Sequence, residues 1–338
     1  MKNSKITNAV ISVTNKCNSK CEMCNIWKSD NKDSLIPQDF LKLPSTLKDI
    51  NITGGEPFLR TDIVEIVENI CKVNPKVKLC FSSNGFLTKK ITKDLIKIQK
   101  INPKISISLS LDGIGEMHSN IRGIDNAYQK VLDTVESLQS NGISAIRFAF
   151  TISKHNISHL SQVYDLSQKL NIELTASLVH NSDNYYNIQT NQLPEFLELE
   201  KHLNYIILQE NKSNNPRRLL RNYYFKGILD YAKTQKRPLK CYAIDNSFFM
   251  DANGDVFPCN ILTKKIGNIK TNTLDSILNP EKINESQKIC LNCNKCWTVC
   301  NVKNSIFKHP IIPIKEVIKM KTKSFCSVSK NPSNIIIP

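Results

Sequence analysis

Short apolar runs alternate with longer amphipathic segments over the first 180 residues of the chain. We interpret the runs as six strands, because each is short and is bounded by polar or glycine residues. The predicted strands are Ala9–Val13, Asp49–Thr53, Val77–Ser82, Ile105–Leu111, Ala145–Thr151 and Glu173–Val179. Apolar residues recur at helical spacing between them, which predicts helices at Thr61–Val73, Thr88–Lys100, Asn126–Asn141 and Asn156–Leu170.

Strands that alternate with helices predict a parallel sheet. Six strands are too few for a closed eight-stranded barrel, so we expect an α/β fold with a curved, partial (β/α)6 TIM-like barrel. Ligands bind such sheets at the carboxyl ends of the strands. Polar or glycine residues follow five of the predicted strands: Gly54-Gly55-Glu56, Ser83-Asn84-Gly85, Asp112-Gly113, Ser153 and His180.

The pattern changes in the second half of the chain. Gln189–Thr234 is helical and more charged, and from Cys241 onward a hairpin is expected around Asp251–Asp255. We therefore predict two domains, a barrel with its following helices at 1–237 and a cysteine-rich domain with a basic tail at 238–338. The tail, Val302–Lys330, carries seven Lys and one Glu, and could be partly disordered or could wrap the first domain.

Length and charge exclude several classes of protein. The 338 residues exceed one ordinary hydrophobic core, which agrees with two domains. The net charge of +16 rests mainly on lysine, since only seven of the 46 basic residues are arginine, so nucleic-acid binding is not expected. No apolar run approaches the ~18 residues of a membrane helix, and the first residues lack a secretory signal. We expect a cytoplasmic protein without a membrane partner.

The twelve cysteines are the strongest chemical signal. A reducing compartment disfavours disulfides, so clustered cysteines point to metal or redox chemistry. They divide into an early group of three, a late group of seven, and the isolated Cys71 and Cys80, which we expect in the core. The early group is Cys17, Cys21 and Cys24, and the late group is Cys241, Cys259, Cys290, Cys293, Cys296, Cys300 and Cys326.

The early group forms a C-x3-C-x2-C triplet directly after the first strand. Three thiolates on one loop can hold a [4Fe–4S] cube and leave one iron open, whereas tetrahedral zinc would need a fourth ligand, which the neighbouring sequence lacks. The triplet resembles that of the radical S-adenosylmethionine (SAM) enzymes. The likeness extends to the strand ends, in Gly54-Gly55-Glu56-Pro57, Ser83-Asn84-Gly85, Ser110-Leu111-Asp112-Gly113 and His118–Arg122.

The resemblance implies reductive cleavage of SAM to a 5′-deoxyadenosyl radical, which abstracts hydrogen from a substrate C–H bond. It implies that Cys17, Cys21 and Cys24 are the catalytic cluster ligands. The expected SAM contacts are Gly54, Gly55, Glu56, Ser83, Asn84, Ser110 and Arg122. Among them the glycines let the backbone approach SAM, Glu56 accepts from its ammonium group, and Ser83 or Asn84 holds its ribose. An electron donor such as flavodoxin or ferredoxin is also implied.

The late group resembles the SPASM extension of radical SAM enzymes, which carries auxiliary [4Fe–4S] clusters. Cys241 and Cys259 match its C-x12-G-x4-C element, but two residues separate Cys293 from Cys296 where the family usually has five. C-x2-C-x2-C-x3-C is the spacing of bacterial ferredoxins, whose fourth cysteine crosses to another cluster. We therefore predict one cluster on Cys241, Cys259 and Cys300, and a second on Cys290, Cys293, Cys296 and Cys326. A single auxiliary cluster, as in the twitch variant, and a zinc ribbon are the alternatives.

The resemblance leaves the substrate open. We expect an oxidoreductase-type enzyme acting on a peptide or protein, although the triplet begins at Cys17, which weakens a maturase with a preceding leader-binding domain. Asn260 stands where sulfatase-maturing relatives have an aspartate base, so that activity is disfavoured. His180, Asp183, Tyr185 and Tyr186 are further candidates for substrate contact. The alternatives are the same chemistry on a carbohydrate or other small molecule, and a non-enzymatic electron carrier or basic nucleic-acid binder.

Overall fold

The structure is a computed structural model that describes residues 6–29, 33–183 and 185–328, with the backbone alone for 323–328. Nine strands form one sheet in the order β6-β5-β4-β3-β2-β1-β7-β8-β9. The strands are β1 (Asn8–Ser12), β2 (Asp49–Thr53), β3 (Lys78–Ser83), β4 (Ile105–Ser110), β5 (Ile146–Ile152), β6 (Glu173–Leu178), β7 (Ser247–Met250), β8 (Asp255–Phe257) and β9 (Gly267–Asn268). The first six are mutually parallel, which confirms the predicted partial barrel.

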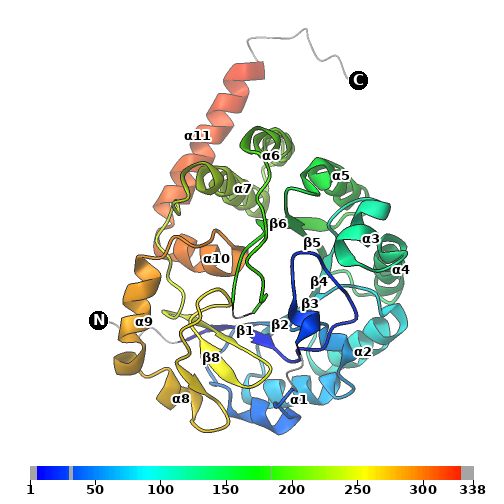
Figure 1. Cartoon of the computed structure of the whole chain (residues 1–338). Helices are drawn as coiled ribbons and strands as arrows, with labels where there is room; N and C mark the ends of the chain where they lie inside the picture. Colours follow the sequence, from blue (N-terminus) through cyan, green and yellow to red (C-terminus); the bar gives the residue numbers. More distant parts are fainter. Residues whose placement is uncertain (1–5, 30–32, 184, 329–338) are drawn as a thin grey trace.

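The helices lie around the outside of the curved sheet (Figure 1). They are α1 (Ile63–Val73), α2 (Thr88–Ile101), α3 (Glu116–Arg122), α4 (Ala127–Ser140), α5 (Leu160–Lys169), α6 (Phe196–Asn211), α7 (Pro216–Thr234), α8 (Leu274–Ile277), α9 (Pro280–Leu291), α10 (Val299–Lys308) and α11 (Ile311–Val328). The four helices predicted in the barrel are present within a few residues of their expected bounds. No helix of the described chain is long and apolar enough to cross a membrane.

Each barrel strand alternates between two faces. The outward residues, such as Ile107 and Phe148, are fully buried against the helices and form the hydrophobic core. The inward residues are mostly polar, and those of adjacent strands stand side by side, as Ser82, Ser108 and Arg147 do in the register. The inner face therefore encloses a polar space, which we call the lumen, instead of a second apolar core.

The predicted hairpin joins the barrel sheet directly. β7 pairs in parallel with β1, with Phe248 opposite Ala9, and β8 then returns antiparallel to β7. The cysteine-rich segment thus continues the sheet of the barrel at its β1 side. The boundary at residue 237 remains a prediction about domains.

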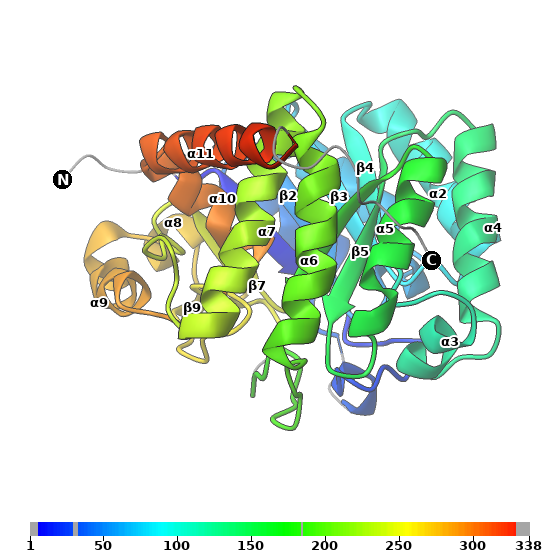
Figure 2. The ribbon, with the colours of Figure 1, turned by 90° about the horizontal axis from the view of Figure 1, so that it is seen from above.

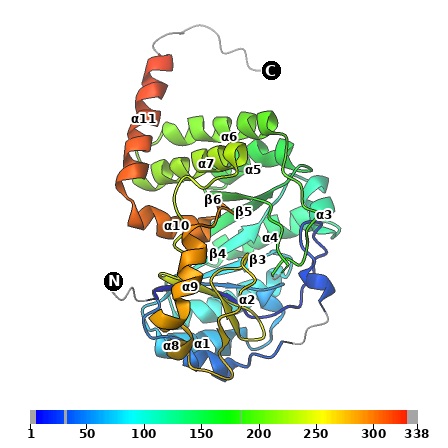
Figure 3. The ribbon, with the colours of Figure 1, turned by 60° about the vertical axis from the view of Figure 1, so that its left-hand side comes forward.

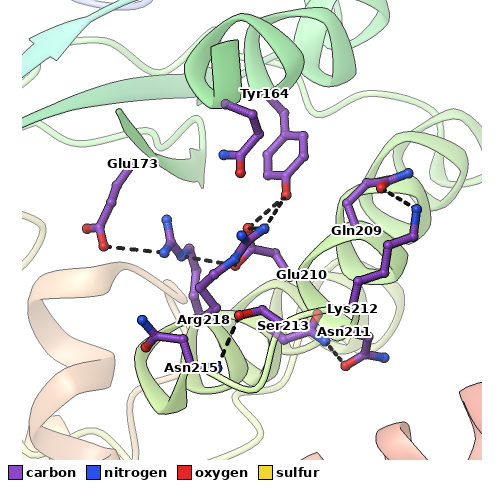
Figure 4. Close-up of polar contacts among 12 residues, drawn as sticks. Tyr164, Glu173, Gln209, Glu210, Asn211, Lys212, Ser213, Asn215 and Arg218 are labelled. Carbon is purple, nitrogen blue, oxygen red and sulfur yellow. Dashed lines mark hydrogen bonds and ion pairs between the residues drawn. The ribbon is translucent and has the colours of Figure 1, made fainter. Parts of the chain in front are cut away.

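α6 and α7 pack against each other, and a buried ionic network secures them to the barrel (Figure 4). The carboxylate of Glu210, which is completely buried, accepts from the hydroxyl of Tyr164 at 2.8 Å and from Arg218 at 3.0 Å. Arg221 of α7 pairs with Glu173 at the start of β6. α11, part of the predicted basic tail, lies across the ends of α6 and α7 (Figures 2 and 3), so the described part of this tail is helical and packs on the first domain.

α10 covers the amino-terminal end of the lumen. Asn304 accepts from the side chain of Asn8 and donates to that of Ser247, and Lys303 pairs with Asp49 at 3.3 Å. Asn8, Asp49 and Ser247 are the first residues of β1, β2 and β7. The helix that carries Cys300 is therefore fixed at the base of three adjacent strands.

Of the two isolated cysteines expected in the core, Cys71 packs against it, whereas Cys80 does not. Cys71, on α1, is half-buried, and its thiol accepts a weak hydrogen bond from Asn102. Cys80 is also half-buried and lines the lumen, because it occupies an inward position of β3. Its apolar neighbours Leu79 and Phe81 point outward, so an apolar-looking strand still presents its thiol to the interior cavity.

Candidate active site

The loop after β1 brings all three early cysteines to one cavity of about 340 Å³ at the carboxyl ends of the strands. Cys21 is buried, whereas Cys17 and Cys24 are half-buried in the cavity wall. Burial raises the pKa of Cys17 to about 12 and that of Cys24 to about 11. The free thiols are therefore held protonated, so the loss of their protons accompanies cluster binding.

Hydrogen bonds with the end of α3 fix the conformation of this loop. The backbone amides of Lys20 and Glu22 donate to the carbonyl groups of Arg122 and Ile121, both at 3.0 Å. The Ser19 hydroxyl also donates to the Arg122 carbonyl at 2.9 Å. The segment His118–Arg122 thus acts first as a backbone template that shapes the cysteine loop.

Gly54 and Gly55 lie directly against the beginning of the cysteine loop. The amide of Gly55 donates to the carbonyl of Thr14 at 2.8 Å. A Cβ atom at Gly55 would overlap the carbonyl oxygen of Lys16, and one at Gly54 would lie 2.5 Å from that of Thr14. Both positions line the cavity, so the glycines allow a close approach of two loops as well as access for a ligand.

Glu56 lies behind the cavity wall and is completely buried. Its carboxylate accepts from the amides of Phe58 at 3.1 Å and Asn84 at 2.8 Å, and from the hydroxyl of Ser83 at 2.9 Å. Burial raises the pKa of Glu56 to about 7, although these hydrogen bonds oppose the shift. In this structure Glu56 fastens the loop after β2 to the loop after β3, and its contact with a SAM ammonium group stays a prediction.

The other expected SAM contacts line the cavity with the three cysteines. These are Gly54, Gly55, Ser83, Asn84, Ser110 and Arg122. Arg122 forms an ion pair with Asp112, which is completely buried and also accepts from the amide of Thr151 at 2.6 Å. The pKa of Arg122 is raised, because Asp112 and Cys21 favour its charged form more than burial opposes it.

Several wall residues were not among the predicted SAM contacts. Trp27 and His180 each have a buried ring nitrogen, Nε1 and Nε2 respectively, without a hydrogen-bond partner in the described structure. Burial lowers the pKa of His180 to about 4, so its ring is neutral. Trp27 follows the triplet by three positions, which is the one sequence signal that could have indicated it. Unpartnered polar atoms in a cavity wall are suited to hydrogen bonds with a bound ligand.

The loop after β6 connects the early cysteines with the cysteine-rich segment. The carbonyl of Tyr186 accepts from the amide of Asn25 at 2.8 Å, and its hydroxyl accepts from the side chain of Asn260 at 3.4 Å. Tyr185 donates to the carbonyl of Gly54 at 2.8 Å and packs edge-on against Tyr186. Both tyrosines line the cavity, where sequence reasoning had named them only as candidates.

The six described late cysteines are electrostatic neighbours, and the structure does not divide them into the two predicted groups. The thiols of Cys241 and Cys290, which are predicted in different clusters, interact, and this interaction lowers the pKa of Cys241 and raises that of Cys290. Cys259, Cys293 and Cys296 are electrostatic neighbours of this pair or of one another. Cys300 is also an electrostatic neighbour of Cys296 and Cys241, and it lines the cavity of the early cysteines as well. The side chain of Cys326 lies outside the described residues. The ligand set of each cluster stays a prediction.

Fold and site together define a partial α/β barrel in which a three-cysteine loop and a cysteine-rich extension face one cavity. A profile of the radical SAM superfamily matches residues 11–167, and one of the SPASM iron–sulfur cluster-binding domain matches residues 241–297. The chain belongs to the radical SAM superfamily and carries a SPASM domain. Membership of this superfamily supports an enzyme, and the two domains imply [4Fe–4S] clusters and SAM as cofactors.

Two curated relatives are similar to this chain over different shares of its length. The antilisterial bacteriocin subtilosin biosynthesis protein AlbA of Bacillus subtilis (strain 168) is 25% identical over 80% of this chain and 59% of AlbA. A probable GTP 3′,8-cyclase of Saccharolobus islandicus (strain L.S.2.15 / Lassen #1) is 28% identical over 48% of this chain and 53% of the cyclase. The chain thus spans somewhat more than half the length of these relatives.

Solved structures establish the fold. Native anSMEcpe with bound AdoMet and Cp18Cys peptide has a TM-score of 0.65 and 18% identity, covering 93% of this chain and 99% of that one. Streptococcus suis SuiB bound to S-adenosylmethionine has a TM-score of 0.62 and 16% identity, covering 83% and 68%. At these identities the likeness concerns the fold alone.

The residues of the cavity fit the cofactors of the family. Three thiols on one loop are the donor set of a cube with an open iron, and the unpartnered nitrogens of Trp27 and His180 offer hydrogen bonds in the same wall. When bound, the cluster and SAM would together supply the radical that abstracts hydrogen in this family. The protein positions the cysteine loop through the backbone of α3 and closes the cavity with the loop after β6.

Proposed function

We propose that this enzyme modifies a peptide or protein by abstracting hydrogen from one of its C–H bonds, in an oxidoreductase-type reaction. The observation that carries the proposal is the shape of the interior space. The cavity of the early cysteines shares Val10, Asn51, Ser82, Thr175, Asn260, Val299 and Cys300 with a second cavity of about 370 Å³ in the lumen. A continuous channel of this size, lined by both polar and apolar groups, suits an extended peptide segment better than one small metabolite.

The comparisons support the same substrate class. AlbA, whose printed name concerns biosynthesis of a bacteriocin, matches across 80% of this chain, whereas the GTP 3′,8-cyclase matches across only 48%. SuiB has also been solved with its precursor peptide SuiA, and the fold it shares with this chain has a TM-score of 0.60. The likeness to AlbA and SuiB therefore favours a peptide substrate.

Residue roles follow from the same proposal. Cys17, Cys21 and Cys24 hold the SAM-binding cluster, and the wall residues from Gly54 to Arg122 hold SAM. The late cysteines hold the auxiliary cluster or clusters, and Cys300 lies where such a group would face the substrate. An external electron donor of the flavodoxin or ferredoxin class, in the cytoplasm, would start the reaction.

The test uses anaerobically reconstituted full-length enzyme, a chemical reductant and SAM. Deuterated candidate peptides should transfer deuterium into 5′-deoxyadenosine, which mass spectrometry detects. The Cys17→Ala variant should lose SAM cleavage, whereas Cys71→Ala should retain it, because Cys71 lies on α1 away from both cavities.

The outcomes separate the possible substrates. Deuterium transfer from a peptide supports the proposal. Transfer only from sugars or nucleotides would replace it with the small-molecule alternative. If reconstituted protein cleaved no SAM at all, a role in electron transfer would be favoured over catalysis on any substrate.

A further inference from the structure

The lower half of the lumen is lined by Cys259 and Cys300 on one side, and elsewhere by polar side chains that are not predicted cluster ligands. Inward positions of β2, β3 and β4 contribute Asn51, Ser82 and Ser108, and the Ser82 hydroxyl donates to Asn51 at 3.0 Å. Hydroxyl and amide groups of this kind can form hydrogen bonds with a peptide backbone. They give the channel polarity without giving it a charge.

Arg147 brings a positive charge to the wall of this region. It occupies an inward position of β5, is half-buried, and lines the lower cavity beside Ser108 in the sheet register. Its guanidinium group forms no hydrogen bond or ion pair with any side chain of the described ranges 6–29, 33–183 and 185–322. The side chain of Lys78, exposed at the rim of the same cavity, also forms none within those ranges.

The nearby carboxylates are already paired with other cations. Glu173 is the register neighbour of Arg147 on β6, but its carboxylate points toward α7 and binds Arg221 at 3.4 Å (Figure 4). Asp49, at the rim of the cavity, binds Lys303 of α10 at 3.3 Å. The local charges therefore leave Arg147 and Lys78 uncompensated on one side of the channel.

A cation that is partly removed from water without a partner costs free energy, and an anionic ligand would relieve that cost. A guanidinium group is also the side chain best suited to hold a carboxylate through two parallel hydrogen bonds. Resting on the proposed function, we infer that the lower lumen is a specificity subsite in which Arg147, assisted by Lys78, binds a carboxylate side chain of the peptide substrate.

The position of Arg147 determines how far the bound carboxylate lies from the site of hydrogen abstraction. Thr151, which lines the upper cavity with the cysteine loop, lies four residues further along β5, or about 13 Å at the rise of a strand. An extended peptide covers that distance in about four residues. The acidic residue should therefore stand about four positions from the residue that loses hydrogen.

Binding of fluorescein-labelled nonapeptide pools to the holoenzyme tests the inference without turnover. One pool carries Glu at a single scanned position, the matched pool carries Gln there, and the remaining positions are Ala, Ser, Asn and Val. We expect the Glu pool to bind wild-type enzyme about tenfold more tightly than the Gln pool at low salt. Arg147→Gln should abolish that preference, whereas Arg217→Gln, at an exposed position of α7, should keep it.

A stability measurement distinguishes recognition from a structural role. Because Arg147 has no partner in the described structure, Arg147→Gln should unfold at the wild-type temperature or above, whereas loss of a structural contact would lower it. Equal binding of the two pools, or a preference that survives Arg147→Gln, would overturn the inference. Arg147-dependent binding of inorganic phosphate without any response to glutarate would also overturn it, since the subsite would then read phosphate. If neither pool binds, the proposed function itself, a peptide as the substrate, is contradicted.

Discussion

The Nη1 atom of Arg122 lies 3.5 Å from the Sγ atom of Cys21, so a cation contacts one of the three cluster cysteines directly. The same guanidinium group is paired with Asp112, and its backbone carbonyl orders the cysteine loop. Arg122 thereby links a buried carboxylate beneath α3 to the cysteine site. From this position one arginine can both stabilise the fold, through Asp112, and contact a cluster cysteine.

Removal of Arg122 should destabilise the protein strongly. Arg122→Gln leaves the completely buried Asp112 without its cation, and breaking a buried pair in this way costs about 3 kcal/mol or more. The Asp112→Asn/Arg122→Gln double variant should cost less than the sum of the single variants, because it leaves no buried charge unpaired. Urea denaturation of the cluster-free chain measures both effects.

An exposed pair provides the control for this cycle. Lys226 and Asp230 are bound at 2.7 Å on the surface of α7, and Lys226→Gln should cost less than about 1 kcal/mol. Strict additivity of the Asp112 and Arg122 variants would show that the two groups do not stabilise the fold as a pair.

The stability of the cluster-free protein should fall as the pH rises because of Glu56. Burial raises the folded-state pKa of this carboxyl group from 4.5 to about 7, so the folded chain binds the proton more tightly than the unfolded chain. Stability is then highest below pH 4.5 as far as this group is concerned, and it declines until about pH 7. The shift corresponds to at most about 3 kcal/mol.

The Glu56→Gln variant isolates this contribution. The urea midpoint of the wild-type protein should fall relative to that of the variant between pH 5 and pH 8, because only the wild type has the titrating group. Since Gln also changes the hydrogen bonds to Ser83 and Asn84, the slope with pH is the relevant quantity and the absolute stability is not. Parallel pH curves would contradict the raised pKa.

Gly227 should be intolerant of a methyl group despite its place inside α7. Trp297, which is almost completely buried, packs so closely that a Cβ at Gly227 would overlap its indole ring. The indole Nε1 also donates to the carbonyl of Tyr224 at 3.0 Å, so the ring has little freedom to move. Gly227→Ala should destabilise by about 1–3 kcal/mol.

Helix propensity alone predicts the opposite sign, since Ala exceeds Gly by about 1 kcal/mol in a helix interior. Thermal unfolding followed by circular dichroism distinguishes the two effects, with Lys233→Ala on the exposed face of α7 as control. A gain in stability for Gly227→Ala would show that Trp297 does not fix α7 against the cysteine-rich segment.

Iron content should reveal how many auxiliary clusters the late cysteines hold. The Cys17→Ala/Cys21→Ala/Cys24→Ala variant loses the SAM-binding cluster, and two auxiliary clusters would leave about 8 Fe per chain. We expect that value after anaerobic reconstitution, with Cys71→Ala as the control that keeps all clusters. A result near 4 Fe would defeat the two-cluster assignment and agree with the contact between Cys241 and Cys290.

Much of the fold follows from the sequence pattern. Short apolar runs separated by amphipathic segments specify six strands and their helices, because burial periodicity is a local property of the chain. β2 has the predicted bounds, and the Asp251–Asp255 turn forms the expected hairpin between β7 and β8. The cysteine loop and the glycine pair also lie at strand ends, where parallel sheets place their ligands.

Other features of the site depend on contacts between distant segments. The sequence alone did not indicate that Glu56 would lie behind the cavity wall, since its exposure depends on the loops after β2 and β3 that it fastens together. Cys80 was expected in the core, but the direction of its strand face was set by pairing with β2 and β4. The local pattern of apolar and polar residues identifies the two faces of a strand. It does not determine whether a given face packs against helices or lines the lumen.

The sequence by itself thus determined the chemistry, because three cysteines on one loop and the motifs at the strand ends specify donor types and their order. Only the tertiary structure decided which groups share a cavity. Strand register and the position of α10 bring Cys300, Asn260 and Arg147 into one channel with the early cysteines and their neighbours. Such encounters depend on the curvature of the sheet and on long-range packing, which no local run of residues encodes.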